Sequence, residues 1–220
     1  MFDAAAYDLE AKQPIEADLD SGAAAVRKKV KRAMDITVAG LLLLLLIPVF
    51  VVVACCIRME SRGPAFFRQR RGGLFGQPFS IYKFRTMRVM EDGPRITQVR
   101  QEDPRITTLG AFLRRTSMDE LPQLINVLKG DMSLVGPRPH AVAHDQEFQE
   151  RIPNYAQRFA MKPGITGLAQ VRGFRGETVT HESLEGRLSA DLEYIRRWSL
   201  MNDVRLLLAT LTVPFNSGAY

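Results

Sequence analysis

The sequence predicts an α+β, mainly helical protein: a small cytoplasmic domain with an N-terminal re-entrant membrane helix hairpin and amphipathic helices at the membrane interface. Three observations lead to this fold class. An uncharged apolar run occupies residues 36–57, a stretch rich in glycine, proline and phenylalanine follows it, and segments with helical periodicity fill the second half. The 220 residues suit one domain with appendages. We therefore expect a tail at 1–25, a membrane segment at 26–60 and a folded domain at 61–220.

Charge is distributed unevenly along the chain. Residues 1–20 contain six acidic residues and one lysine, a net charge of −5, so a total of +6 leaves +11 for the other 200 residues. The acidic stretch has no sustained periodicity, which is typical of a loosely ordered tail. The basic remainder favours anionic lipid headgroups or phosphorylated substrates. It does not favour nucleic acid, because no basic array with interleaved aromatic residues is present. The two cysteines, Cys55 and Cys56, lie in the apolar run and predict neither disulfides nor a metal site.

The apolar run of 22 residues is long enough to cross a bilayer, since it spans about 33 Å as a straight helix. Its flanks do not suit a simple crossing. Each flank carries five basic residues: Arg27, Lys28, Lys29, Lys31 and Arg32 before it, and Arg58, Arg62, Arg68, Arg70 and Arg71 after it. Basic flanks mark the cytoplasmic side, and a crossing helix places only one flank there. Pro48, near the middle, removes a helical hydrogen bond. A hairpin that bends at Pro48 is therefore favoured over a kinked span.

The elements of the remaining chain follow from local pattern. Residues 63–87 are punctuated by glycine and proline and indicate short strands or irregular structure. The phenylalanines and arginines there suit either a membrane surface or a packed β-hairpin. Helical segments are expected at 108–115, 120–129, 140–151, 183–198 and 202–213. The last of these is apolar enough to cap the core or to lie on the membrane. The glycine-rich residues 162–178 predict a loop or hairpin.

The segment from 114 to 139 contains the candidate chemistry. Asp119 precedes a helical pattern, and with Asp119 as the N-cap, Pro122 falls at a tolerated position of the first turn. On spacing alone, an ordinary capping role for Asp119 is the simpler interpretation. A second interpretation uses the same geometry. A helix N-terminus favours phosphate and keeps a carboxylate ionised, as a nucleophile must be.

The neighbours of Asp119 support phosphate chemistry. Glu120 offers a second carboxylate, which with substrate phosphates could hold a divalent cation. Arg114 and Arg115 precede the pair, and Arg138 lies between two prolines in a stiff turn. Guanidinium groups bind phosphate in a bidentate manner. None of these elements is specific alone. His140, His144 and His181 lack metal-ligand spacing, so we expect them on the surface or in loops, with His140 as a minor candidate for a phosphate neighbour.

Several separated motifs, in order, resemble the bacterial sugar transferase family. They are "KRAMD", "IYKFRTM", "TSMDELPQLINVLKGDMSLVGPRP" and "KPGITGLAQVRG". These relatives are monotopic polyprenol-phosphate phosphoglycosyl transferases that start surface polysaccharides. The resemblance implies a bacterial inner-membrane protein with its sugar transferase domain on the cytoplasmic face. It implies UDP-sugar and undecaprenyl phosphate as substrates and Mg²⁺ as cofactor, and it leaves a homodimer open.

The resemblance also implies residue roles. Asp119 is implied to be the nucleophile, which forms a phosphosugar–aspartyl intermediate as UMP leaves, and Glu120 its partner and the metal ligand. Further substrate-binding positions are implied for Lys83, Arg85, Arg114, Arg138, Asp191 and Asp203. Arg172 and Arg175 suit contacts with the nucleotide or sugar, but solvated loop arginines are an equal alternative. The chain departs from the family at Ile47, where relatives carry serine, and at Met118, where they carry leucine.

The sequence leaves alternatives for the sugar that is transferred and for the class of protein. The run "GPRPHAVAHDQEF" and the later "GFRGET" are more similar to the branch that transfers hexose 1-phosphate, with glucose first and galactose second, than to the N-acetylhexosamine branch. A non-catalytic membrane adaptor of a polysaccharide assembly complex is the rival class. A basic peripheral protein that binds anionic lipid or nucleic acid is a third.

Overall fold

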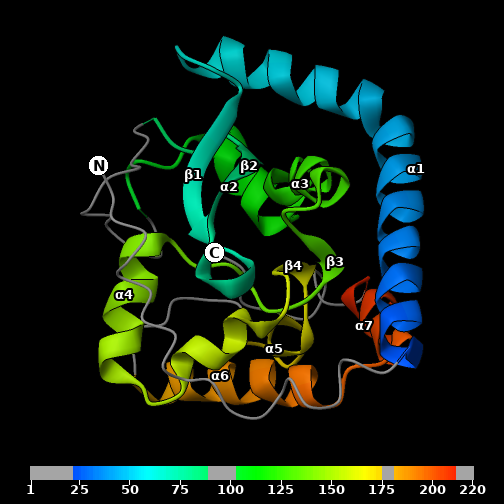
Figure 1. The fold of residues 1–220 in the computed structure, drawn as a ribbon. Coiled ribbons are helices and arrows are strands. Elements are labelled where there is room, and N and C mark those ends of the chain that lie inside the picture. The colour runs from blue at the N-terminus through cyan, green and yellow to red at the C-terminus, as the bar shows by residue number, and fades with distance from the viewer. Residues whose placement is uncertain (1–21, 89–102, 175–180, 212–220) are drawn as a thin grey trace.

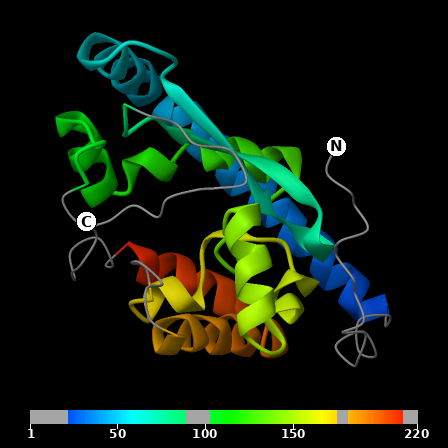
Figure 2. The same cartoon turned by 90° about the vertical axis from the view of Figure 1, so that its left-hand side faces the viewer.

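We describe a computed structural model of the chain, which places residues 22–88, 103–174 and 181–211. It is mainly helical, with two small two-stranded sheets. Figure 1 shows a long helix, α1, along two edges of the molecule, with the other elements on the inner side of its bend. Figure 2 shows the first hairpin on one side and the orange and red C-terminal helices on the opposite side.

Helix α1 (Gly22–Glu60) contains the whole apolar run and has Pro48 inside it. It is one continuous helix with a sharp bend in its middle part (Figure 1), where we expected a broken hairpin. It also begins at Gly22, within the predicted tail. A proline inside a helix is a common cause of such a bend. By length and composition α1 could cross a membrane. Its large exposed apolar side chains gather around the bend: Leu41, Leu42, Leu44, Leu45, Ile47, Val51 and Val52.

The N-terminal half of α1 is attached to the domain by polar contacts, two of which are buried. Lys31 donates to a carboxylate oxygen of Asp203 at 2.6 Å. Asp35, which is 3% exposed, accepts from the backbone amide of Leu134. Nearer the surface, Arg32 donates to two carbonyls in the last turn of α3 (Gln123–Lys129). The "KRAMD" motif therefore joins α1 to the domain.

The stretch after α1 forms an antiparallel hairpin, as one of the two interpretations predicts. Strands β1 (Phe66–Gly72) and β2 (Pro78–Phe84) pair from Phe66 opposite Phe84 to Gly72 opposite Pro78. A short turn, η3 (Leu74–Gly76), connects them. The ring of Phe84 packs against Phe50 of α1 and Phe66. The hairpin therefore packs against the part of α1 that follows Pro48.

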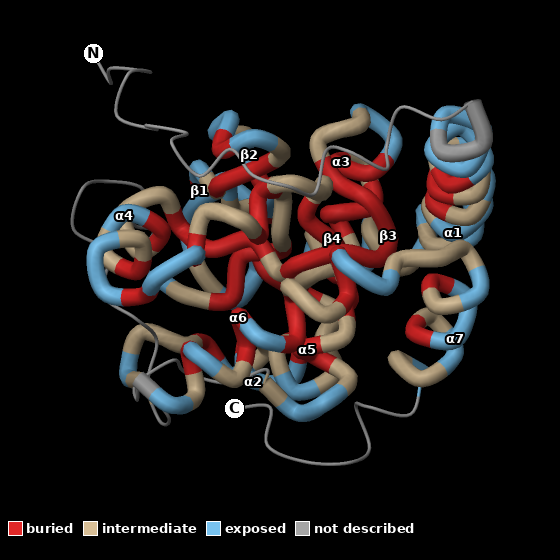
Figure 3. The backbone as a smooth tube through the Cα atoms, turned by 60° about the horizontal axis from the view of Figure 1, so that its bottom comes forward, coloured by how far each residue is buried: buried red, intermediate tan, exposed pale blue. Residues whose placement is uncertain are grey.

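The core surrounds a parallel pair of short strands, β3 (Ser133–Val135) and β4 (Gly164–Thr166). Figure 3 shows buried backbone concentrated around β3, β4 and α3, whereas α1 is mostly exposed or intermediate. The sequence spacing places Leu184, Leu188, Leu192 and Ile195 on one helical face. Leu184, Leu188 and Ile195 are buried, and Leu192 is partly buried. β4 lies where we expected a loop or hairpin, and the last part of that segment, residues 175–178, lies outside the described residues.

All five expected helices are present. The bounds of α2 agree with the prediction, and the other four helices have shifted ends. The described helices and helical turns of the domain are α2 (Thr108–Arg115), η4 (Met118–Glu120), α3, α4 (Val142–Arg151), η5 (Tyr155–Ala160), α5 (Leu168–Val171), α6 (His181–Arg196) and α7 (Leu200–Thr210). Two of these, η5 and α5, had no predicted counterpart because they are too short to show a periodic pattern. The loop between β3 and α4 carries Arg138.

Candidate active site

The acidic pair lies in the connection from α2 to α3. Asp119 and Glu120 belong to the short 3₁₀ turn η4, and α3 begins only at Gln123, with Pro122 as its N-cap. The prediction that Asp119 caps α3 is therefore wrong. The chain enters the turn through Ser117, which has a left-handed φ of 58°. Serine seldom adopts this conformation, and such strain often marks functional sites. The turn leaves the carboxylate of Asp119 without a capping role.

Glu120 is held by two cations. The Nζ of Lys83, on β2, donates to Oε1 at 2.8 Å. Arg138 donates through Nη1 to Oε2 at 2.9 Å and through Nη2 to Oε1, a bidentate pair. Burial alone would raise the pKa of Glu120, but the charges of Arg138 and Lys83 hold it well below its usual value. Glu120 is therefore ionised throughout the physiological pH range.

Asp119 has the opposite environment. It is 7% exposed, and its carboxylate makes no hydrogen bond or ion pair within the described part of the chain. Burial raises its pKa to about 6, and the neighbouring charge of Glu120 adds to the rise. Three cations oppose the rise: Lys83, Arg114 and Arg138. When two adjacent carboxylates have pKa values that their environments shift in opposite directions, they often have different roles in an active site: one reacts and the other stays charged.

Arg114 lies beside Asp119 on the last turn of α2. Its Nε donates to the hydroxyl of Thr86 at 3.0 Å. Burial lowers the pKa of Arg114, and the negative charge of Asp119 is the largest effect that opposes this. The structure thus brings together four of the residues that the sequence nominated around Asp119: Glu120, Lys83, Arg114 and Arg138. They come from α2, η4, β2 and the loop after β3.

Other nominated residues lie elsewhere. Arg85 donates to the carbonyls of Ile57, Ser61 and Arg62, so it caps the C-terminal end of α1 instead of facing the acidic pair. A guanidinium is favourable there because the end of a helix carries unpaired carbonyls. This position gives Arg85 a structural role.

The two distant acids are also held in structural contacts. Asp203 has no exposed surface and accepts from Lys31, Tyr194 and Trp198. Asp191, 2% exposed, accepts from Arg158 at 2.8 Å. Neither carboxylate meets the acidic pair.

Of the two arginines in the glycine-rich segment, Arg172 and Arg175, the structure describes only the first. Arg172 forms an exposed ion pair with Glu193, at 2.6 Å, which is the solvated alternative for this residue. Arg175 lies outside the described residues. Their proposed contacts with nucleotide or sugar stay predictions.

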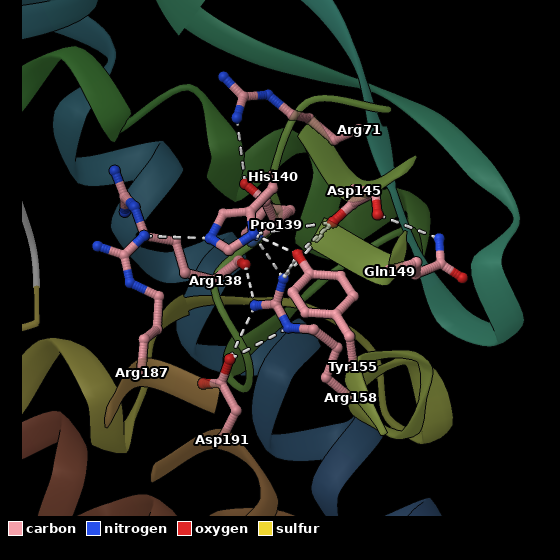
Figure 4. Close-up of polar contacts among 10 residues, drawn as sticks. All are labelled: Arg71, Arg138, Pro139, His140, Asp145, Gln149, Tyr155, Arg158, Arg187 and Asp191. Carbon is pink, nitrogen blue, oxygen red and sulfur yellow. Dashed lines mark hydrogen bonds and ion pairs between the residues drawn. The ribbon is translucent and has the colours of Figure 1, made fainter. Parts of the chain in front are cut away.

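A buried polar cluster behind Arg138 was not predicted (Figure 4). It contains His140, Asp145, Tyr155, Arg158, Arg187 and Asp191, with Arg71 at its edge. His140 lies in a loop, one of the two places expected for it, but it is buried there, with 7% of its surface exposed. Burial, followed by the charges of Arg158 and Arg187, holds its pKa well below the usual value. The arginines face opposite ring nitrogens, at 2.8 and 3.1 Å. Neutral imidazole has one acceptor nitrogen, so only one arginine can donate to it in either tautomer.

The carboxylates of Asp119 and Glu120 fit a magnesium ion only if substrate phosphates supply part of its coordination shell. Within the described residues, no group of three His, Cys, Asp or Glu side chains is arranged to hold a metal. Mg²⁺ needs only one or two carboxylates when substrate phosphates and water complete its shell. Both oxygens of Glu120 already accept from Lys83 or Arg138, whose charges repel a free cation. The residues therefore fit a magnesium ion that arrives together with a diphosphate.

The fold and site define a class of protein: a small helical domain that joins an apolar bent helix to a buried carboxylate among fixed cations. The chain matches the family described as "Bacterial sugar transferase" over residues 26–217 and belongs to it. It is 50% identical over 208 residues to the UDP-glucose:undecaprenyl-phosphate glucose-1-phosphate transferase of Escherichia coli K12, covering 94% of this chain and 45% of that protein. It is 54% identical over 181 residues to the Caulobacter vibrioides protein of the same name, covering 82% and 68%.

Relatives with another sugar in their names are also similar. The galactosyl transferase CpsE of Streptococcus agalactiae is 41% identical over 198 residues, which cover 83% of this chain and 41% of that protein. The chain spans less than half the length of the Escherichia coli and Streptococcus relatives and about two thirds of the Caulobacter protein.

Proposed function

We propose that this chain transfers a hexose 1-phosphate from a UDP-sugar to undecaprenyl phosphate and releases UMP. This reaction would be the first membrane step of exopolysaccharide or capsule synthesis. The observation that carries the proposal is the carboxylate of Asp119, which has no partner in the described part of the chain and lies among Lys83, Arg114 and Arg138. Glucose is the first choice of sugar because the Escherichia coli and Caulobacter relatives are named for UDP-glucose.

The proposed reaction has two displacement steps. A carboxylate oxygen of Asp119 attacks the phosphorus that bears the sugar. An aspartyl O–P bond forms, the bond from that phosphorus to the bridging oxygen breaks, and UMP leaves with that oxygen. A phosphate oxygen of undecaprenyl phosphate then attacks the same phosphorus. The aspartyl O–P bond breaks, the carboxylate of Asp119 returns, and the sugar is left on a lipid diphosphate.

The surrounding residues have separate roles in this scheme. Burial keeps Asp119 poorly hydrated, so its ionised form is reactive, and nearby cations keep a useful fraction ionised at neutral pH. Arg114, Lys83 and Arg138 are placed to stabilise phosphate charge in the transition state. Glu120 orients Lys83 and Arg138 and would hold Mg²⁺ together with the substrate phosphates. When bound, that ion would neutralise negative charge on the diphosphate.

The membrane arrangement is part of the proposal. We place the bend of α1 in the cytoplasmic leaflet of the inner membrane, with the domain on the cytoplasmic face. Exposed leucines and valines around the bend and basic residues on both flanks support this placement. A soluble UDP-sugar and a lipid phosphate then reach Asp119 from the same side of the membrane.

The test is UMP release from purified protein in detergent or nanodiscs, with undecaprenyl phosphate, Mg²⁺ and a panel of UDP-sugars. We expect release with UDP-glucose and none from Asp119→Asn. The matched control is Glu147→Gln, the same type of change at an exposed glutamate, and it should keep wild-type turnover. Normal turnover by Asp119→Asn would exclude Asp119 as the nucleophile.

The panel also separates the alternatives. Preference for UDP-galactose or a UDP-N-acetylhexosamine would keep the chemistry and change the sugar. A wild-type chain that releases no UMP from any UDP-sugar would support the membrane adaptor instead.

A further inference from the structure

The loop that carries Arg138 is held along its whole length. Four consecutive carbonyl oxygens, those of residues 137–140, each accept a hydrogen bond from a distant part of the chain (Figure 4 shows two of these). The donors are Gly164 N to Pro137 at 2.9 Å, Arg158 Nη2 to Arg138 at 2.6 Å, Arg71 Nη1 to Pro139 at 3.2 Å and Gly72 N to His140 at 3.2 Å. Prolines on both sides of Arg138 further restrict its backbone. The loop has little freedom to move its arginine.

Arg158 is the centre of this arrangement. It is 3% exposed, and all five of its N–H donors face acceptors when Nδ1 of His140 is the acceptor nitrogen. The contacts are two to Asp191, at 2.8 and 3.2 Å, one to the carbonyl of Arg138, and one each to Tyr155 and His140, both at 2.8 Å. No donor is left for a substrate. Arg158 therefore does not qualify as a binding residue, although it contacts Arg138 directly.

The contacts form a chain that ends at the acidic pair. Asp191, on α6, orients Arg158, on η5. Arg158 donates a hydrogen bond to the carbonyl of Arg138. The guanidinium of Arg138 in turn donates to the carboxylate of Glu120, which is next to Asp119 in the sequence. A shift of the Arg138 backbone would move its charge relative to both carboxylates.

We propose that Arg158, oriented by Asp191, is a positioning residue that acts on the proposed transfer reaction through Arg138. This inference rests on the proposed function. It gives Asp191, nominated from the sequence as substrate-binding, a different role, because Asp191 acts through Arg158 and does not touch the substrate.

A measurable consequence is a loss of kcat with little change in the KM for the UDP-sugar. Arg138 is placed to stabilise phosphate charge in the transition state, and its guanidinium donates to Glu120 beside Asp119. A displaced Arg138 backbone moves this charge away from the position that the reaction needs. Misplacement of a catalytic group by about 1 Å can cost roughly 100-fold in rate.

The test compares UMP release by Arg158→Lys in the wild-type and Arg138→Lys backgrounds. Lysine keeps the charge but cannot reproduce the five directed donors. We expect roughly a 10- to 100-fold loss of kcat, with little change in KM, in the wild-type background. In the Arg138→Lys background we expect little further loss. Asp191→Asn, which keeps the side-chain shape, should give a smaller change of the same kind, and it decides the question if Arg158→Lys does not fold.

The matched control is Arg32→Lys, the same change at an arginine that also holds two carbonyls, those of Val127 and Leu128. Any effect that it has on kcat should be independent of Arg138→Lys. Equal losses from Arg158→Lys in both backgrounds, or a loss that appears in KM alone, would overturn the positioning role while wild-type turnover keeps the proposed function. A wild-type chain without turnover would overturn both.

Discussion

At the scale of single residues, the site is defined by the contrast between Asp119 and Glu120. They are neighbours in sequence, are both largely buried and share the same cations, yet the pKa of one is raised and that of the other is lowered. The cause is direct contact with the cations. The charges of Arg138 and Lys83 lower the pKa of Glu120 most, and their hydrogen bonds to it add to this effect. The same two residues act on Asp119 through their charge, and burial outweighs them there.

This contrast predicts a pH dependence. The nucleophile must be ionised, and the pKa of Asp119 is about 6, so turnover should fall as the pH decreases through about 6. Lys83→Gln removes a cation that lowers this pKa, and the acidic limb should move to higher pH. The measurement is the rate of UMP release between pH 5 and 8. Lys129→Gln, at an exposed lysine outside the site, is the control and should not move the limb. A limb that stayed near pH 4 in the wild type would show that Asp119 does not have this environment.

At the scale of elements, buried charge joins α1 to the domain. The ammonium of Lys31 and the carboxylate of Asp203 are 2.6 Å apart, and their side chains are 11% and 0% exposed. Asp203 also accepts from Trp198, the one tryptophan of the chain. Contacts of this kind set how α1 is oriented relative to the domain that carries the acidic pair.

Lys31→Met should therefore destabilise the protein strongly. It leaves the carboxylate of Asp203 buried without its cation, and breaking such a pair costs about 3–5 kcal/mol. The free energy of unfolding can be followed by the fluorescence of Trp198 during urea denaturation. Arg151→Met breaks an exposed pair with Glu147 and should cost less than about 1 kcal/mol. Similar costs for the two variants would contradict the importance of the buried pair.

At the scale of the whole molecule, the bend of α1 is the feature on which the proposed membrane arrangement depends. The domain lies on the inner side of the bend (Figure 1), and the large apolar side chains around the bend are exposed. A helix that entered and left on one side would put both basic flanks beside the same headgroups. A straight helix would separate them.

Cysteine labelling tests this arrangement. Lys28 and Arg62 are exposed positions on either side of the apolar run. After Cys55 and Cys56 are replaced by serine, Lys28→Cys and Arg62→Cys should react with an impermeant reagent from the cytoplasmic side only. A reaction of the two positions from opposite sides would show a spanning helix.

The sequence by itself determined the features that depend on neighbouring residues. The apolar run, the proline inside it, the helix at 108–115 and the apolar face of α6 all follow from composition and period, which are local properties. The resemblance between motifs also nominated Asp119, Glu120, Lys83, Arg114 and Arg138, and the structure brings these five together. Position in a motif did not distinguish binding residues from supporting ones.

Only the tertiary structure decided that distinction. Arg85 caps α1, Asp203 pairs with Lys31, and Asp191 holds Arg158, each through a partner at least 23 positions away. His140 lies in a loop and Arg158 in the short 3₁₀ helix η5, and neither is long enough for a periodic pattern to predict burial. The capping role expected for Asp119 failed because a 3₁₀ turn precedes α3. Spacing along the chain reports local geometry, whereas the role of a buried charge depends on which distant groups fold against it.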